Sequence, residues 1–455
     1  MNILENAKKS LQSFTKNSNA SSEVTNCKDI PFHFGIDVLD RLITFIHEHT
    51  VSSNLQISSV TTLCLSYTCS YVNLKGCESY VFDLSPGATG KDSAFDRAYD
   101  LVLKPVMEMQ NEKKAQYDYQ RQSSDEKLAQ KSFHCIHTAD ATEQGVIAGF
   151  DNTKAQFVAI GEVGSKLKNK EHPLINFITR VYGKNNIVKP NYKKDLGAGG
   201  DLTIDGISLF FYGNSNFQML GKSTFKHHLV GGLLNRCILV YNTKTRLFED
   251  RPDSYDISPE VLKESHFSIH RLMIYGEKNA SKAKPKLIKT DLYVEFDRYI
   301  YDLTNQCSGS ELEYLFKRVM QNLNAVIYTL HYLLGAQEDV WWDEVQESTI
   351  VLGINYMKYV LEGYDALIDE IIGASAEERE EGAVAKLHSV IFSLSKKQNC
   401  SKLKHRDIYR AAHLTRQEYD KLVLNMHYKT DKKFLHILTE PSMTSVTCDK
   451  TKEVS

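Results

Sequence analysis

The sequence predicts an α/β fold in which a mostly parallel sheet is flanked by helical regions and followed by a small basic C-terminal domain. Three observations support this prediction. Short apolar segments rich in β-branched and aromatic residues recur between residues 80 and 241, separated by stretches long enough for crossovers between parallel strands. Apolar residues at helical spacing fill the flanking regions. Basic residues concentrate near the C-terminus.

The composition is that of an ordinary globular protein. The chain has 455 residues, 25% of them charged and 42% hydrophobic, and a net charge of -2. No stretch approaches the roughly 18–20 apolar residues of a membrane-spanning helix, and the polar N-terminus lacks the apolar centre of a secretory signal. The 9 cysteines are scattered and form no CxxC pair. We therefore expect a reduced, cytoplasmic protein with no membrane partner.

The first 75 residues divide into a tail and a helical lead-in. Residues 1–29 show little apolar periodicity and are expected to form a flexible polar tail. Within residues 30–75, apolar side chains recur at helical spacing between Phe34 and Ile46, which predicts an amphipathic helix. The apolar run Val60–Val72 predicts a second, buried helix.

Residues 76–275 are predicted to form the α/β core. A helix is expected to begin near Lys91 and to continue through Val106. Strands are expected at Tyr80–Leu84, Phe133–His137, Phe157–Ile160, Ile207–Tyr212 and Arg236–Tyr241.

Two further regions follow a soft boundary at Gly276–Pro285. Residues 286–375 are predicted to be helical, because two segments carry long apolar stripes, Leu312–Leu334 and Ser348–Ile372. Ala376–Gly382 either begins the next helix or forms a solvated hinge. Residues 383–440 are predicted to form a winged-helix-like domain, with helices at Ala383–Leu394, Lys404–Ala412 and Arg416–Met426 and a strand at Phe434–Leu438.

The segment SPGATGKDS, residues 85–93, joins the first strand to the following helix. A Gly-containing turn at a helix N-terminus can direct backbone N–H groups at a phosphate, and Lys91 can reach the β- and γ-phosphates of a nucleotide. Nucleotide contacts are therefore expected from Gly87, Ala88, Thr89, Gly90, Lys91, Asp92 and Ser93. The alternative is an ordinary turn whose lysine faces solvent.

Two positions depart from the usual GxxxxGK[ST] pattern. Ser85 stands where the first glycine belongs, and Asp92 stands where the magnesium-binding Ser or Thr belongs. Asp92 or Ser93 would then serve the metal.

The strand Phe157–Ile160 is followed by Gly161 and Glu162. In P-loop enzymes an acidic residue at such a place holds magnesium and polarises the attacking water. Glu162 is therefore a candidate general base and metal ligand, although Gly161 replaces the first carboxylate of the usual Asp-Glu pair. Alternatively, Glu162 only caps a strand at the surface.

Two later strands carry further candidates. Asn214 and Ser215 follow an apolar strand and either sense a γ-phosphate or form a polar turn. Arg236 enters the last strand and either stabilises transition-state charge, in its own subunit or across an interface, or forms a surface ion pair. His227 and His228 point about 100° apart on a helix and lack a third ligand at suitable spacing, so no metal site is expected there.

In this order, the PGATGKD turn, the strand ending in Glu162, and the segments ISLFFYGNSN and GGLLNRCILVY resemble a family of P-loop ATPases from phages, plasmids and integrated mobile elements. That family is catalogued largely as a domain of unknown function. The resemblance covers about residues 30–375. It implies a RecA-like P-loop NTPase core similar to replicative helicases, with ATP and Mg²⁺ as cofactors. It also implies single-stranded or forked DNA as partner and a homo-oligomer, by analogy a hexamer.

The C-terminal segment between residues 395 and 437 holds 11 basic and 4 acidic residues, in a chain that is nearly neutral overall. A basic helical domain favours contact with phosphate backbones. The pattern at Thr415 to Glu418 predicts a capped helix start that exposes Arg416, Gln417 and Tyr419. Lys404, Arg406, Arg416 and Gln417 are the expected DNA contacts. A solvated cationic face is the alternative.

Two functions follow from these features. The first is an ATP-hydrolysing, helicase-like protein that acts on DNA in the replication of a mobile element. The second is a scaffold or DNA-binding factor that keeps the fold without turnover, as Ser85 and Gly161 suggest. A defence or partitioning role would use the same site.

Overall fold

The computed structural model describes residues 32–87, 89–123, 132–138, 140–150, 152–184, 186–189, 202–242, 252, 254–398, 402–411, 416, 419–420, 423, 429–430 and 434–436. The chain divides into two compact units, Met1–Asp369 and Glu370–Ser455. The tail predicted for residues 1–29 lies outside the described residues.

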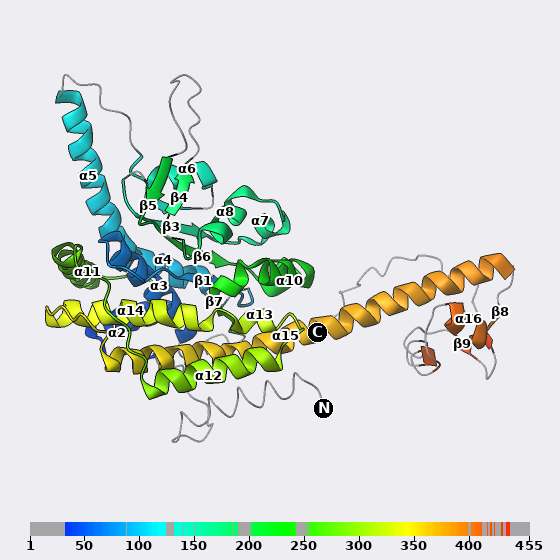
Figure 1. Cartoon of the computed structure of the whole chain (residues 1–455). Helices are drawn as coiled ribbons and strands as arrows, with labels where there is room; N and C mark the ends of the chain where they lie inside the picture. Colours follow the sequence, from blue (N-terminus) through cyan, green and yellow to red (C-terminus); the bar gives the residue numbers. More distant parts are fainter. Residues whose placement is uncertain are drawn as a thin grey trace, which may run out of the picture. The chain divides into compact units, whose positions relative to one another are not determined.

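The first unit is an α/β structure built on a five-stranded, fully parallel sheet (Figure 1). The spatial order is β2-β3-β6-β1-β7. The bounds are β1 Tyr80–Asp83, β2 Ile136–His137, β3 Ala155–Ile160, β6 Ser208–Asn214 and β7 Cys237–Val240. Nearly all of their residues are buried, which fits the apolar runs in the sequence. All five predicted strands are therefore confirmed, with shifts of up to three residues at their ends.

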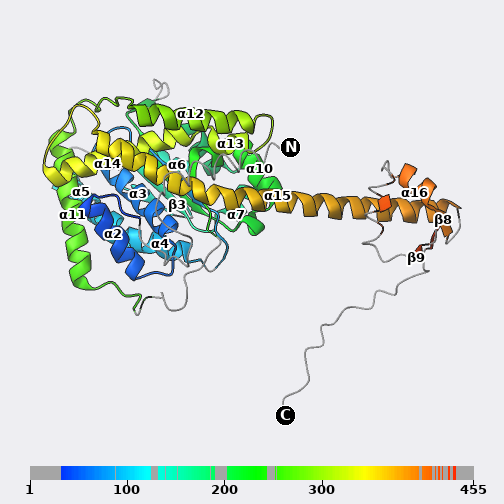
Figure 2. The same ribbon diagram turned by 90° about the horizontal axis from the view of Figure 1, so that it is seen from below.

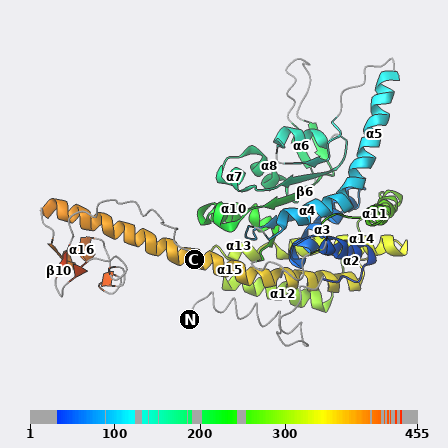
Figure 3. The ribbon, with the colours of Figure 1, turned by 180° about the vertical axis from the view of Figure 1, so that it is seen from behind.

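The chain reverses its direction of travel along the sheet. The connection from β1 to β2 runs one way, whereas β3 to β6 and β6 to β7 run the other way. Because such crossovers are right-handed, the two sets of helices cover opposite faces. Accordingly α4 (Lys91–Ala98) packs with α3 (Asn54–Tyr71), and α7 (Gly164–Lys168) packs with α9 (Phe217–Leu220) and α10 (Lys222–Gly231) on the other side (Figure 3).

This reversal determines where a ligand site is expected. In open parallel sheets, ligands bind outside the carboxyl ends of the strands at the point where the strand order reverses. In this sheet that point lies between β1 and its neighbour β6, where the chains leave towards opposite faces.

Helix α3 is completely buried, in agreement with the predicted buried helix. It begins with a capping box in which the Ser53 hydroxyl accepts from the Gln56 backbone N–H while the Gln56 side chain accepts from the Ser53 N–H. One face lies on the sheet, and α2 (Asp37–Glu48), α11 (Pro259–Asn279) and α14 (Val319–Glu338) pack on the rest (Figure 2). The central helix thus joins the sheet to the flanking helices.

The region 286–375 contains helices, as its apolar stripes predict. Its helices are α12 (Asp291–Gln306), α13 (Glu313–Phe316), α14 and α15 (Glu347–Gln398). All residues up to Asp369 belong to the same compact unit as the sheet, because α14 packs directly on α3. The stretch Ala376–Gly382 is helical, so the structure selects a helix over a hinge there.

The remaining elements of the first unit are shorter. The helix predicted from Lys91 runs from α4 through the π-helical turn η1 (Tyr99–Leu103) into α5 (Lys104–Ser123). Sequence patterns missed the antiparallel pair formed by β4 (Asn186–Lys189) and β5 (Leu202–Asp205). Three elements complete the crossovers, namely α6 (Glu143–Gly149), α8 (Pro173–Val181) and η2 (Leu234–Arg236).

The second unit contains a three-stranded antiparallel sheet in the order β8-β10-β9. Its elements are β8 Lys402–Lys404, α16 His405–Ala411, β9 Lys429–Thr430 and β10 Phe434–His436. Tyr419 was expected at an exposed helix start, and this is wrong: the side chain is fully buried, with its hydroxyl 2.7 Å from the His405 ring. The predicted helix Ala383–Leu394 is part of α15.

A carboxyl group at the amino ends of the strands gives a pH prediction. Glu78 accepts hydrogen bonds from the backbone N–H groups of Leu209 (3.2 Å) and Gly183 (3.0 Å), and burial raises its pKa from 4.5 to about 8. The unfolded chain therefore releases this proton first, and the contribution to stability falls as pH rises from 4.5 to about 8.

We expect Glu78→Gln to remove this pH dependence. The melting temperature of the variant minus that of the wild type should rise between about pH 5 and pH 8 and stay constant above it. Thermal unfolding of the full chain across this range is the measurement, with the exposed Glu171→Gln as control. A difference that is flat for both variants would contradict the assignment.

Candidate functional site

The turn after β1 brings the chain from Asp83 to the start of α4 at Lys91. Gly90 has φ of 81°, in the left-handed region that glycine favours. Its carbonyl accepts a hydrogen bond from the Ser52 hydroxyl at 2.6 Å. A Cβ on residue 90 would lie 2.8 Å from that hydroxyl oxygen of Ser52. Glycine is therefore required here by both backbone conformation and space.

A side chain from α3 holds the turn from beneath. The Gln56 amide donates to the Asp83 carboxylate at 2.9 Å and to the Thr89 hydroxyl at 3.2 Å. The Thr89 hydroxyl in turn donates to the Pro86 carbonyl at 2.9 Å. These bonds fix the buried side of the turn, while Gly87 on its outer side is exposed.

Lys91 points its ammonium into the protein beneath this turn. Its side chain is 6% exposed, and Nζ lies 3.2 Å from Oε1 of Glu162, whose side chain is 53% exposed. The contact is an ion pair without hydrogen-bond geometry, and Nζ has no hydrogen-bond acceptor among the described residues. A nearly buried ammonium whose ion-pair partner is half-exposed and which lacks a hydrogen-bond acceptor among the described residues is suited to receiving a further anion.

Glu162 is held in a strained backbone conformation. Its φ of 48° is unusual for a residue other than glycine. Its backbone N–H donates to Oδ1 of Asn214 at 2.9 Å, and the next N–H, that of Val163, donates to the Asn214 carbonyl at 2.9 Å. The strain is thus maintained by β6, and it directs the carboxylate towards Lys91.

Asn214 also binds Asp92 across the site. Its Nδ2 donates to Asp92 Oδ1 at 2.7 Å. The neighbouring Ser215 donates its backbone N–H to the Asp83 carbonyl at 2.9 Å, and its buried hydroxyl has no partner among the described residues. Ser93 is half-buried on α4, next to Asp92.

The structure therefore brings the main candidates together at the carboxyl ends of the strands. The group consists of Lys91, Asp92, Glu162, Asn214 and Ser215. The two strands that precede Lys91 and Glu162, β1 and β3, are not adjacent: β6 lies between them and carries the asparagine that connects both sides. Ala88 lies outside the described residues.

Arg236 lies at the amino ends of the strands, opposite the carboxyl ends where the Lys91 group lies. The next residue, Cys237, pairs with Tyr80 at the amino end of β1, whereas Lys91 follows the carboxyl end of that strand. The guanidinium faces the ring of Tyr182, with Cζ 5.9 Å from its centroid. Arg236 therefore lies near the amino end of β1, whereas Lys91 follows its carboxyl end, so Arg236 is not among the candidates that the structure brings together around Lys91.

Sequence reasoning missed Asp83 and Gln56. Burial raises the pKa of the Asp83 carboxyl, and bonds to Ser85 and Gln56 together with the charge of Lys91 oppose this shift. Asp83 was visible as a carboxylate that ends an apolar strand directly before the Gly-containing turn. Gln56 gave no signal, because only the fold brings α3 beneath the turn.

Positive side chains of the second unit are partly available for contact. Lys404 and Arg406 are exposed at the junction of β8 and α16. Arg416 is exposed but donates through Nε to Asp420 at 2.9 Å. Gln417 lies outside the described residues.

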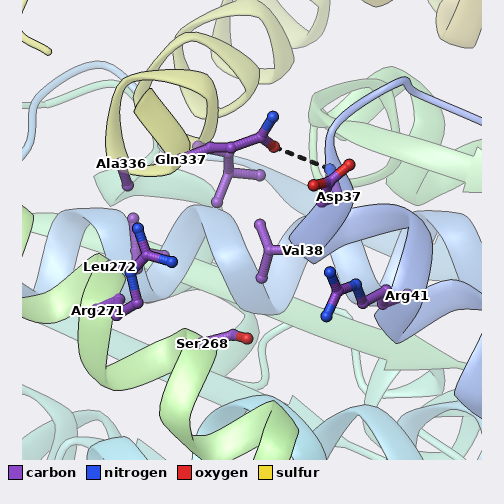
Figure 4. A pocket seen from close by; sticks show the side chains of 9 residues that line it. Asp37, Val38, Arg41, Ser268, Arg271, Leu272, Ala336 and Gln337 are labelled. Atoms are coloured by element: carbon purple, nitrogen blue, oxygen red, sulfur yellow. Dashed lines mark hydrogen bonds between the residues drawn. The ribbon is translucent and has the colours of Figure 1, made fainter. Parts of the chain in front are cut away.

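A separate shallow pocket lies where α2, α11 and α14 meet (Figure 4). Gln337 Oε1 accepts from the Asp37 backbone N–H at 2.9 Å, and Arg41 pairs with Glu264 at 2.5 Å beside it. The pocket shares no residue with the Lys91 group.

Neither a metal-binding cluster nor a membrane-spanning helix is found in the described part of the chain. His228 uses Nε2 in a 2.7 Å contact with the Leu167 carbonyl. Within the described ranges, no group of three or more His, Cys, Asp or Glu side chains is placed to hold a metal by itself. None of the helices described is long and apolar enough to span a bilayer.

The arrangement of the residues is the basis on which a function can be proposed for this chain. No protein-family model matches the chain, and no curated protein matches it.

Proposed function

We propose that the chain binds and hydrolyses ATP with Mg²⁺, through a RecA-like P-loop core. The observation that carries this proposal is the 3.2 Å approach of the buried Lys91 ammonium to Glu162. The pair lies at the carboxyl edge of the sheet beside the reversal in strand order, where α/β folds bind ligands. An ammonium, a carboxylate and a helix N-terminus together suit phosphoryl chemistry.

Each side chain has a role in this proposal. Lys91 binds the β- and γ-phosphates, with the turn at Gly87 to Gly90 around them, and Asp92, Ser93 and Glu162 serve magnesium. A magnesium ion needs only one or two protein carboxylates when phosphates and water complete its shell. Glu162 also orients the attacking water, while Asn214 and Ser215 sense the γ-phosphate.

Arg236 acts across an interface in the same proposal. It is half-buried, its Nε has no hydrogen-bond partner among the described residues, and Arg318 lies on the same ring of Tyr182. The charge of Arg318 adds to burial in lowering the pKa of Arg236. Nη1 of Arg236 donates to the Gly232 carbonyl, a neutral acceptor that leaves the positive charge without a counter-ion in the contacts described. Such a charge favours an anion supplied from outside the chain, which is consistent with a homo-oligomer such as a hexamer.

A second candidate is a scaffold that binds nucleotide without turnover. The specific observation in its favour is Gly161, which leaves β3 without the first carboxylate of the usual pair. Both candidates predict binding, and only the first predicts release of phosphate.

We propose DNA as the partner through a winged-helix-like second unit. Its support is the excess of basic residues between residues 395 and 437 and the exposure of Lys404 and Arg406. In this proposal ATP hydrolysis drives movement on DNA, as in a replicative helicase of a mobile element.

The test is phosphate release by the full chain with Mg²⁺-ATP, with and without single-stranded DNA. We expect turnover that DNA stimulates. Replacing Lys404 and Arg406 by alanine should leave basal turnover unchanged and weaken DNA binding, lowering the slope of log affinity against log salt by about 1.4, the value for two phosphate contacts on a single strand.

The matched control replaces two exposed lysines of the first unit, Lys104 and Lys170, by alanine. Binding of nucleotide without any turnover would favour the scaffold. DNA affinity equally affected by both double variants would contradict the assigned DNA surface.

A further inference from the structure

Two departures from the usual motif meet at one point in space. Asp92 replaces the usual Ser or Thr at the start of α4, and Gly161 replaces the usual carboxylate after β3. A Cβ atom built on Gly161 would meet Asp92 Oδ1 at 3.8 Å and no other atom within 4 Å. The Asp92 carboxylate therefore lies where a carboxylate on residue 161 would reach.

Resting on the proposed function, we infer that Asp92 supplies, from helix α4, the metal-binding carboxylate that β3 lacks at Gly161. The two departures from the motif then compensate each other, because the carboxylate missing at Gly161 is present at Asp92. The ligand class is a divalent cation bound together with a nucleoside triphosphate. The site is complete by this reading, because its number of carboxylates is unchanged.

The position of Asp92 is built and not incidental. Asn214 Nδ2 donates to Asp92 Oδ1 at 2.7 Å, and the same amide accepts the Glu162 N–H through Oδ1 at 2.9 Å. One side chain of β6 thereby fixes the spacing between both acidic residues. The carboxylate also lies in the first turn of α4, where the helix dipole favours negative charge.

A second observation, the environment of Lys91, points to a ligand that contains phosphate and metal. The Lys91 side chain is 6% exposed, and its Nζ faces the same space, 3.2 Å from Glu162 and without a hydrogen-bond acceptor among the described residues. A buried ammonium beside a carboxylate pair matches a site that receives phosphate and metal together.

Glycine at 161 is explained by Asp92 and not by backbone strain. Its φ lies outside the left-handed region, so an aspartate there would be conformationally tolerated. What such an aspartate would meet is a second negative charge at van der Waals distance. Its effect must therefore depend on which residue occupies position 92.

The test is a cycle of four full-length proteins: wild type, Asp92→Ser, Gly161→Asp and the double variant. Affinity for a fluorescent ATP analogue is measured with Mg²⁺ and with EDTA. We expect Asp92→Ser to lower the Mg²⁺-dependent affinity by at least about tenfold. Adding Gly161→Asp should restore it in that background and give no gain in the wild-type background.

Melting temperature without nucleotide provides an independent readout. Gly161→Asp should destabilise the wild type through charge repulsion and destabilise Asp92→Ser less. The matched control is Asp96→Ser, an exposed acidic residue one turn further along α4, which should not couple to position 161.

The outcomes separate the inference from the proposed function. If the wild type binds Mg²⁺-nucleotide but Gly161→Asp acts equally in both backgrounds, the compensation between Asp92 and Gly161 is overturned while the nucleotide site stands. If the wild type binds no nucleotide at all, both are overturned. Rescue in the double variant supports both.

Discussion

Lys91→Met should abolish ATP turnover, with a loss of at least about 100-fold, the scale seen when one preorganised electrostatic group is removed. The ammonium has no hydrogen-bond acceptor among the described residues, and the proposed contact with phosphate would supply one. Methionine keeps the length of the apolar stem and removes only the charge. The measurement is steady-state phosphate release, together with equilibrium binding of Mg²⁺-ATP.

The same variant should keep or raise the melting temperature. A buried charge without a hydrogen bond destabilises the fold, and the Glu162 carboxylate, whose side chain is 53% exposed, remains solvated when its partner is removed. The buried Asp83 carboxyl, whose pKa is already raised by burial, loses the opposing charge of Lys91 and can stay protonated. Lys104→Met, on the exposed surface of α5, is the control and should change neither quantity. A variant that unfolds, or that keeps wild-type turnover, would contradict a functional role for Lys91.

Glu162→Gln should separate binding from chemistry. Turnover should fall by about 10²–10⁴-fold, because general-base assistance is lost. Affinity for metal-free ATP, measured in EDTA, should stay the same or increase, since the variant removes a negative charge that would face the phosphates and frees Lys91 from its ion pair. Single-turnover hydrolysis and equilibrium binding measure the two effects.

Glutamine also preserves the backbone N–H that Asn214 Oδ1 accepts, so the turn itself should be retained. The matched control is Glu171→Gln, which changes an exposed glutamate later in the connection that follows β3. Loss of binding equal to the loss of turnover would show that Glu162 is structural. Unchanged turnover would remove it from the chemistry.

The features that the sequence predicted correctly are local ones. β1 and β3 are short, fully buried strands that appear in the sequence as apolar runs, the first ending in Asp83 and the second followed by Gly161 and Glu162. The turn before Lys91 was visible as a Gly-containing segment between an apolar strand and a helix. Lys91 and Glu162, which the structure places 3.2 Å apart, were named from their positions in the segments that follow these two strands.

The features that were missed depend on long-range packing. No local pattern reveals that β6 inserts between β1 and β3, so the role of Asn214 in linking Asp92 to Glu162 could not be predicted. Arg236 was named as a candidate because arginine can stabilise transition-state charge. Which end of the sheet it occupies depends on where β7 begins, and no local pattern reveals this. Helix α15 continues through a charged stretch that read equally well as a hinge.

The most direct test of the central claim is a structure of the full chain with a non-hydrolysable ATP analogue and Mg²⁺. The account predicts that the Lys91–Glu162 ion pair opens, that the ammonium contacts the terminal phosphates, and that the metal lies beside Asp92. An unchanged ion pair at saturating analogue, or an analogue bound at another edge of the sheet, would contradict it.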